Sequence, residues 1–184
     1  MGVPFTAPEL DEGNFETLTI SGQLRVVEKA VDGGPVVMMG SSLGGYLAAL
    51  FAARRVQEVE KLVLLAPAFQ FPTRWTARYS AEELERWRAR GTIPFFHYGH
   101  KEERALGYQI VEDASGYEDE PAFRQPALVL HGRRDEVVPV EASKVFAQGH
   151  PNVRLKVLES GHELTDVLDQ LWAETAAFLE FQSL

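Results

Sequence analysis

Cysteine is absent from the 184 residues of the sequence. This absence excludes disulfide bridges, thiolate nucleophiles and metal sites built on cysteine. The sequence also has no apolar run near the ~20 residues that cross a bilayer, and no basic segment followed by an apolar core that would mark a signal peptide. We therefore expect a cytoplasmic protein that does not act in a membrane.

Basic residues are too few to offset the acidic ones. Eighteen Lys and Arg stand against 27 Asp and Glu, which gives a net charge of −9. A protein that binds nucleic acid needs a basic face, so this balance argues against a nucleic-acid partner. The 45% hydrophobic and 24% charged residues are ordinary for a soluble globular protein of one domain.

Short apolar runs alternate with longer amphipathic segments, a pattern typical of an α/β fold with a mostly parallel sheet. Apolar spacing predicts helices that start near Thr19, Leu43 and Leu164. Strands are expected at residues 3–7, 36–39, 61–66, 127–130 and 153–158. The strand 36–39 is continuously apolar and should be buried on both faces, whereas 153–158 alternates as an edge strand or a half-exposed strand does.

The alternation of strands and helices lapses between Pro67 and Pro126. Ser80 and Glu83 there have the spacing of a capping box, which predicts a helix. A long excursion between two central strands is often a lid or cap. A surface insertion with a small core of its own fits the pattern equally well.

A glycine-rich seam follows the apolar run 36–39. Gly40, Ser42 and Gly44 satisfy G-x-S-x-G between a predicted strand and a predicted helix, the setting of a nucleophile elbow. A serine on such a sharp turn is crowded by its neighbours two residues away, and glycine at both places relieves the crowding. Gly45 would let the helix pack close to the sheet. The plain alternative for Ser42 is an ordinary helix N-cap.

Two late loops carry the partners that a serine nucleophile needs, in the order acid and then histidine. Asp135 follows the strand 127–130, and His162 follows the strand 153–158. Glu136 is the alternative carboxylate. Because both loops deliver the required residue type in the required order, the sequence predicts a triad of Ser42, Asp135 and His162.

The remaining histidines are weaker candidates. His97 and His100 lie in the insertion and His150 lies in a Gly-His-Pro turn, while His131 ends a strand and is expected to pack or to form a local hydrogen bond. No pair has metal-ligand spacing on a convincing scaffold, so we expect no metal site.

With these residues identified, the chain resembles the α/β-hydrolase superfamily, and within it the small single-domain bacterial esterases of the YqiA-like group. The resemblance rests on APELDEG, GSSLGGYLAAL, LVLLAPAF, HGRRDEVVP and SGHELTD. It implies a three-layer fold with helices on both faces of the sheet, in one domain over 1–184, with a small helical cap insertion at 68–125.

The resemblance further implies that Ser42 is the nucleophile, Asp135 the acid and His162 the general base, and that the N–H of Leu43 lines the oxyanion hole. The expected chemistry is hydrolysis of a small-molecule carboxylic ester or thioester without a cofactor, and the oligomeric state stays open. The insertion supplies candidates for an acyl pocket, although packing in a small core is the more common role of such aromatic residues: Phe69, Phe71, Trp75 and Trp87.

Members of this group usually begin with a strand that ends in a His-Gly loop, followed by a helix. The present sequence starts at the later segment VPFTAPEL. Because the His-Gly loop ordinarily gives the second oxyanion donor, we expect a complete triad with weakened turnover. The alternative is a non-catalytic binding protein of hydrolase fold that retains the triad.

Overall fold

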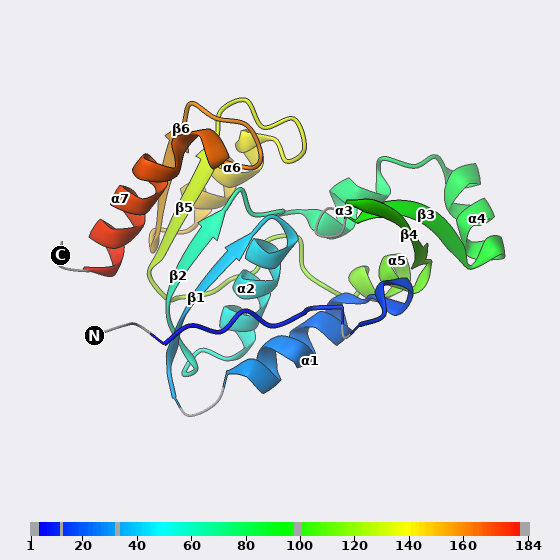
Figure 1. Ribbon diagram of the computed structural model, residues 1–184, viewed down its shortest axis with the longest axis horizontal. Coiled ribbons are helices and arrows are strands. Elements are labelled where there is room, and N and C mark those ends of the chain that lie inside the picture. Colours follow the sequence, from blue (N-terminus) through cyan, green and yellow to red (C-terminus); the bar gives the residue numbers. More distant parts are fainter. Residues whose placement is uncertain (1–3, 12, 32–33, 98–100, 181–184) are drawn as a thin grey trace. The chain divides into compact units, whose positions relative to one another are not determined.

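The computed structural model describes residues 4–11, 13–31, 34–97 and 101–180 (Figure 1). The chain divides into two compact units. The unit that we call the sheet unit comprises Gly33–Gln70 and Glu120–Leu184, and the one that we call the hairpin unit comprises Met1–Asp32 and Phe71–Asp119. The N-terminal segment and most of the predicted insertion 68–125 therefore form one unit, and the predicted strands after residue 33 belong to the other.

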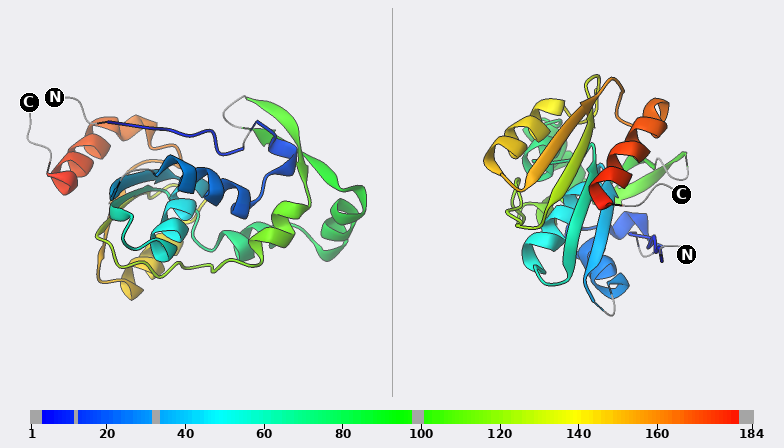
Figure 2. Two further views of the ribbon diagram at one scale, coloured as in Figure 1. Left: turned by 90° about the horizontal axis from the view of Figure 1, so that it is seen from below. Right: turned by 90° about the vertical axis from the view of Figure 1, so that its left-hand side faces the viewer.

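The sheet unit contains a four-stranded parallel sheet in the order β1-β2-β5-β6. Its strands are β1 (Val36–Ser41), β2 (Val59–Leu65), β5 (Ala127–Gly132) and β6 (Val153–Leu158). Its helices are α2 (Leu43–Arg54), α6 (Val140–Gly149), the short η2 (Thr165–Val167) and α7 (Leu168–Leu179). Helices α2 and α6 cover one face of the sheet and α7 the other (Figure 2, right), so the expected three layers are confirmed.

Burial follows from this layering. Strand β5 is buried along its whole length because it lies between β2 and β6 and has helices on both sides. Helix α2 is apolar almost all round, and its residues 45–52 are buried. On the α7 side, the core consists of Leu128, Leu130, Leu158 and Leu164, packed against Leu65, Val167, Leu171 and Phe178.

The prediction that the strand 36–39 is buried on both faces is wrong. Burial alternates along β1, and Val37 and Met39 keep 45% and 49% of their surface exposed. Strand β1 lies at an edge of the sheet, and α2 packs against it, whereas α7 packs on β5. Continuous apolar character therefore did not distinguish an edge strand, covered on one face, from a central one.

The hairpin unit contains helices and a two-stranded antiparallel sheet. Its helices are η1 (Phe15–Thr17), α1 (Ile20–Ala30), α3 (Phe71–Thr76), α4 (Ala81–Arg90) and α5 (Gln109–Ala114). Its strands β3 (Thr92–His97) and β4 (Glu102–Gly107) pair in register, Thr92 with Gly107 and His97 with Glu102. The sequence predicted a helical insertion. The structure shows that the insertion also includes this two-stranded hairpin.

The expected strand at residues 3–7 does not form over the described residues 4–7, and Val3 lies outside the described residues. Pro4 in this segment and Pro8 directly after it lack the N–H that a sheet ladder requires. The capping box is confirmed: Ser80 accepts from the Glu83 amide at 3.2 Å, and Glu83 accepts from the Ser80 amide at 2.7 Å.

The turn between β1 and α2 has an unusual backbone. Ser42 has φ 52° and ψ −120°, in the left-handed half of conformational space that a side chain rarely adopts. A Cβ on Gly40 would lie 2.3 Å from the carbonyl oxygen of Gly44, whereas a Cβ on Gly44 would meet nothing within 4 Å. Of the two glycines expected to relieve crowding, only Gly40 does so. Gly45 approaches the Gly40 carbonyl oxygen and Pro67 as the helix passes the sheet.

Gly40 and Gly44 form a matched pair for a stability measurement. We expect Gly40→Ala to lower the free energy of unfolding by about 1–3 kcal/mol or more, because the new methyl group meets backbone that cannot move aside. Gly44→Ala should leave the free energy unchanged or raise it by up to about 1 kcal/mol, since alanine is the better helix former. Urea unfolding of both variants is the measurement, and equal values for the two would contradict the assignment of the crowded position.

Candidate active site

The structure brings Ser42, His162 and Asp135 into one hydrogen-bonded chain. His162 Nε2 lies 3.1 Å from Ser42 Oγ, and His162 Nδ1 lies 2.7 Å from Asp135 Oδ2. The three residues directly follow or lie shortly after the carboxyl ends of β1, β6 and β5, which meet at one edge of a parallel sheet. All three belong to the sheet unit.

Asp135 fixes the tautomer of His162. An ionised carboxylate only accepts hydrogen bonds, so Nδ1 of His162 carries the proton and Nε2 presents its lone pair to the hydroxyl of Ser42. The side chain of Asp135 is fully buried, while that of His162 is 14% exposed. Glu136, the alternative acid, lies on the surface.

Hydrogen bonds keep the buried carboxylate of Asp135 ionised. Burial alone would raise the pKa of Asp135, but the hydrogen bonds from His162 and from the amides of Val138 and Val137 outweigh burial and hold that pKa below its ordinary value. Oδ1 accepts from the Val137 amide at 2.9 Å and from the Val138 amide at 2.8 Å. The Asp135 carboxylate is therefore charged and held in place by its own loop.

A second histidine, which the sequence did not predict for the site, contacts this carboxylate. Nε2 of the fully buried His131, from the end of β5, lies 3.1 Å from Asp135 Oδ2. The prediction of a local hydrogen bond for His131 is confirmed, because Nε2 also lies 2.9 Å from the Val138 carbonyl. The four-residue spacing between His131 and Asp135 could have suggested the contact. It brings the two side chains together only because the loop after β5 turns back on the strand.

The loops that carry the acid and the base are joined through their backbones. A Cβ on Gly132 would lie 2.2 Å from the Gly161 carbonyl oxygen, so only glycine permits this approach. The Arg134 amide donates to the Ser160 carbonyl at 2.9 Å, and its guanidinium donates to the Glu159 carbonyl at 2.9 Å. The distance between Asp135 and His162 therefore rests on main-chain contacts.

Ser42 stands at the N-terminal end of α2, and Leu43 is the first residue of that helix. The amides of the first turn of a helix point out of its N-terminus and favour negative charge there. The Leu43 amide, next to the nucleophile position, is thus placed where an elbow donates to an oxyanion.

The four aromatic residues considered for an acyl pocket all take part in packing. Phe69 belongs to the sheet unit, is fully buried and stacks on Phe146 with ring centroids 3.8 Å apart. In the hairpin unit, Trp75 stacks on Phe71 at 5.1 Å and meets Trp87 edge-on at 5.6 Å. Trp87 also donates from its indole nitrogen to the Leu106 carbonyl at 3.1 Å.

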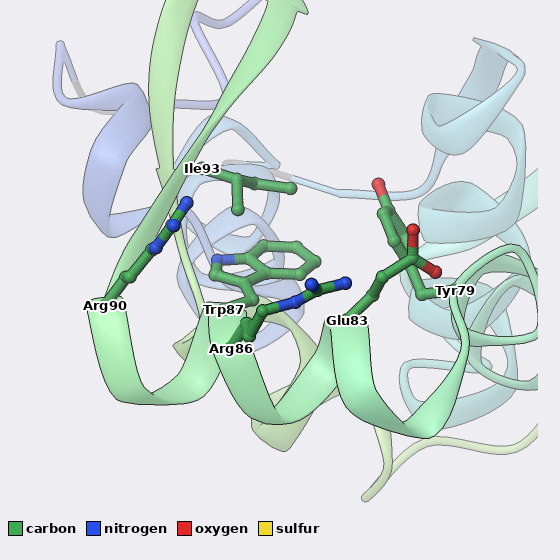
Figure 3. A pocket seen from close by; sticks show the side chains of 6 residues that line it. All are labelled: Tyr79, Glu83, Arg86, Trp87, Arg90 and Ile93. Atoms are coloured by element: carbon green, nitrogen blue, oxygen red, sulfur yellow. The ribbon is translucent and has the colours of Figure 1, made fainter.

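One surface hollow lies in the hairpin unit (Figure 3). It is lined by Tyr79, Glu83, Arg86, Trp87, Arg90 and Ile93, so Trp87 is the only one of the four aromatic candidates that borders it. Two arginines and a glutamate give the hollow a polar rim around the indole ring.

The remaining three histidines, His97, His100 and His150, lie in other parts of the chain. His150 Nδ1 donates to the Phe146 carbonyl at 2.7 Å, His97 belongs to β3, and His100 lies outside the described residues. Over the described ranges, no group of three or more His, Asp or Glu side chains has the arrangement of a metal site. In that same part of the chain, no helix is long and apolar enough to span a membrane.

Comparisons with known proteins agree with this fold. A palmitoyl-protein thioesterase, ABHD10, of Bos taurus mitochondria is 27% identical over 168 residues, which cover 86% of this chain and 55% of the relative. A 2-hydroxymuconate semialdehyde hydrolase of Pseudomonas putida is 30% identical over 159 residues, 68% of this chain and 55% of the relative. The chain thus spans just over half the length of these curated relatives.

Among solved structures, Est1E of Butyrivibrio proteoclasticus with bound ferulic acid superposes with a TM-score of 0.76 at 25% identity. The superposition covers 92% of this chain and 71% of Est1E. Residues 4–180 match the Uncharacterised protein family UPF0227. The chain therefore belongs to this family and to the α/β-hydrolase superfamily, in the YqiA-like group that the sequence motifs had indicated.

Proposed function

We propose that the protein is a serine hydrolase that cleaves small carboxylic esters, thioesters included, through an acyl-enzyme on Ser42. One observation carries the proposal: an unbroken chain of hydrogen bonds, 3.1 Å and 2.7 Å long, from Ser42 Oγ through His162 to the buried carboxylate of Asp135. Esterase and thioesterase relatives support the same reaction class. A serine hydroxyl is a weak nucleophile until a base so oriented removes its proton.

In the first half of the proposed cycle, Ser42 Oγ attacks the carbonyl carbon of the ester and its proton passes to His162 Nε2. The imidazolium that forms is stabilised by the charge of Asp135. The carbon–oxygen bond of the leaving alcohol then breaks, and the alcohol takes the proton from Nε2. The acyl group stays on Ser42. For a thioester the leaving group is a thiol.

In the second half, a water molecule replaces the alcohol. His162 Nε2 takes a proton from the water as its oxygen attacks the acyl carbon, and the same nitrogen returns that proton to Ser42 Oγ when the acid leaves. The cycle consumes one ester and one water and yields one acid and one alcohol. Every proton transfer in the cycle passes through His162 Nε2.

The Leu43 amide is the proposed donor to the oxyanion that forms in both halves. Loss of one of two oxyanion donors costs about 10²–10³ in kcat.

Ser42 has a matched control in its neighbour. We expect Ser42→Ala to abolish hydrolysis of short p-nitrophenyl esters and covalent labelling by a fluorophosphonate, since the attacking oxygen is gone. Ser41→Ala should retain both, because Ser41 is the last residue of β1 and is not linked to His162 by the contacts described above. Turnover that survives Ser42→Ala would contradict the proposal. A folded wild-type protein without labelling or turnover would favour the binding-protein alternative.

The acid can be assigned in the same way. Asp135→Asn should lower kcat by about 10³–10⁴, because an amide can donate to Nδ1 and favour the wrong tautomer of His162. Glu136→Gln, which removes the adjacent exposed charge, should stay within about twofold of wild type because surface groups away from the site have little effect. The measurement is kcat on one ester for both variants, and a larger loss in Glu136→Gln would reverse the assignment.

A further inference from the structure

We propose that His131 is a positioning residue for the acid of the triad, holding the Asp135 carboxylate with Oδ2 turned toward His162. The inference rests on the proposed function, but its central observation is structural. Two histidines from different elements converge on one carboxylate oxygen: His162 Nδ1 at 2.7 Å and His131 Nε2 at 3.1 Å from Asp135 Oδ2.

The surroundings of His131 fix which nitrogen carries its proton. Nε2 lies 2.9 Å from the Val138 carbonyl oxygen, which can only accept, so Nε2 is the protonated nitrogen. Nδ1 lies 2.8 Å from the Ser143 hydroxyl and accepts from it. Val138 belongs to the acid loop and Ser143 to α6, so the ring is held from two sides. Nε2–H donates to the Val138 carbonyl, and the same nitrogen lies 3.1 Å from Asp135 Oδ2.

The two oxygens of Asp135 are held in different ways. Oδ1 is held by the amides of Val137 and Val138, both within its own loop. Without His131, Oδ2 would be held only by His162, the group whose orientation it is meant to define. His131 lies at the end of β5, the most buried strand of the sheet. It therefore holds the carboxylate in place whether or not His162 has taken up a second proton.

A neutral donor is required at this position. Burial lowers the pKa of His131, and the hydrogen bond to Val138 and the charge of Asp135 oppose that effect only in part. A charged His131 would neutralise Asp135 and weaken its hold on His162. The ionisable groups around His131 are Asp135 on the acid loop, His162 on the loop after β6 and, more distantly, Glu141 on α6.

Three variants separate positioning from packing. His131→Leu removes the donor, and His131→Gln keeps an amide N–H at about the reach of Nε2. His150→Leu makes the same chemical change at a partly buried histidine that stacks on Phe146 and Phe123 and whose hydrogen bonds, among the described residues, lie within α6 and its own turn. Each is assayed for kcat and KM on a p-nitrophenyl ester across pH, with its unfolding midpoint recorded.

We expect His131→Leu to lower kcat by roughly 10–100-fold with KM changed less than twofold, the effect of losing one hydrogen bond to a charged group. The acid limb of its pH profile of kcat/KM should also move to higher pH, because a carboxylate with fewer stabilising neighbours attracts protons more strongly. His131→Gln should recover most of kcat and the wild-type limb. His150→Leu should lose stability only.

Equal kcat and pH profiles for His131→Leu and His131→Gln would overturn the proposal, as would the same kinetic loss in His150→Leu. If His131→Leu does not fold, the wild-type protein gives the answer through ¹⁵N-NMR of its histidine rings. His131 must then appear as the neutral Nε2–H tautomer at the pH of the kinetic assays, and a charged ring or an Nδ1–H tautomer would overturn the proposal. This readout needs no turnover, so it stands apart from a failure of the hydrolase proposal, which would show as inactive wild-type protein.

Discussion

The arrangement of the site depends on one buried charge. The carboxylate of Asp135 has no exposed side-chain surface, and an ion buried in this way costs several kcal/mol unless hydrogen bonds replace its hydration. Three hydrogen bonds replace it, from two amides of its own loop and from His162, and His131 Nε2 lies 3.1 Å from the same carboxylate. Because these groups come from β5, the loop after it and the loop after β6, the charge can be stable only if those three segments keep their positions. The carboxylate thus constrains the local fold as well as the base.

The backbone of the sheet unit meets that constraint in two ways. Gly132 lets the acid loop touch the loop of His162, and the Arg134 amide bonds that loop at Ser160. The nucleophile has its own support, since the carbonyl of the strained Ser42 accepts from the amides of Gly45, Tyr46 and Ala68, and its amide donates to Leu65. A left-handed residue costs of order 1–3 kcal/mol. These backbone hydrogen bonds, each worth about 0.5–1.5 kcal/mol, offset that cost. All the hydrogen bonds of the triad therefore lie in one unit.

The sequence predicted those parts of the structure that local chemistry determines. The close approach of Gly40 to a carbonyl depends on one turn, the proximity of Asp135 and His162 follows from the order of the strands, and the capping box needs only Ser80 and Glu83. It did not predict what depends on neighbours distant in the chain. The exposure of Val37 and Met39 reflects the edge position of β1, which no apolar pattern encodes. The hairpin around Pro94 was hidden because proline usually argues against a strand.

His131 illustrates the same division within the site. In the sequence it is a strand-end histidine beside a glycine, a setting in which most histidines simply pack. Its place in the site depends on three contacts that form only in the folded chain. The His131 ring contacts the Val138 carbonyl, the Ser143 hydroxyl on α6 and the Asp135 carboxylate. A buried polar group without partners destabilises the fold, so its full set of partners accounts for why histidine can stand in a core strand at all. That one of those partners is the acid of the triad links the packing of β5 to the orientation of His162.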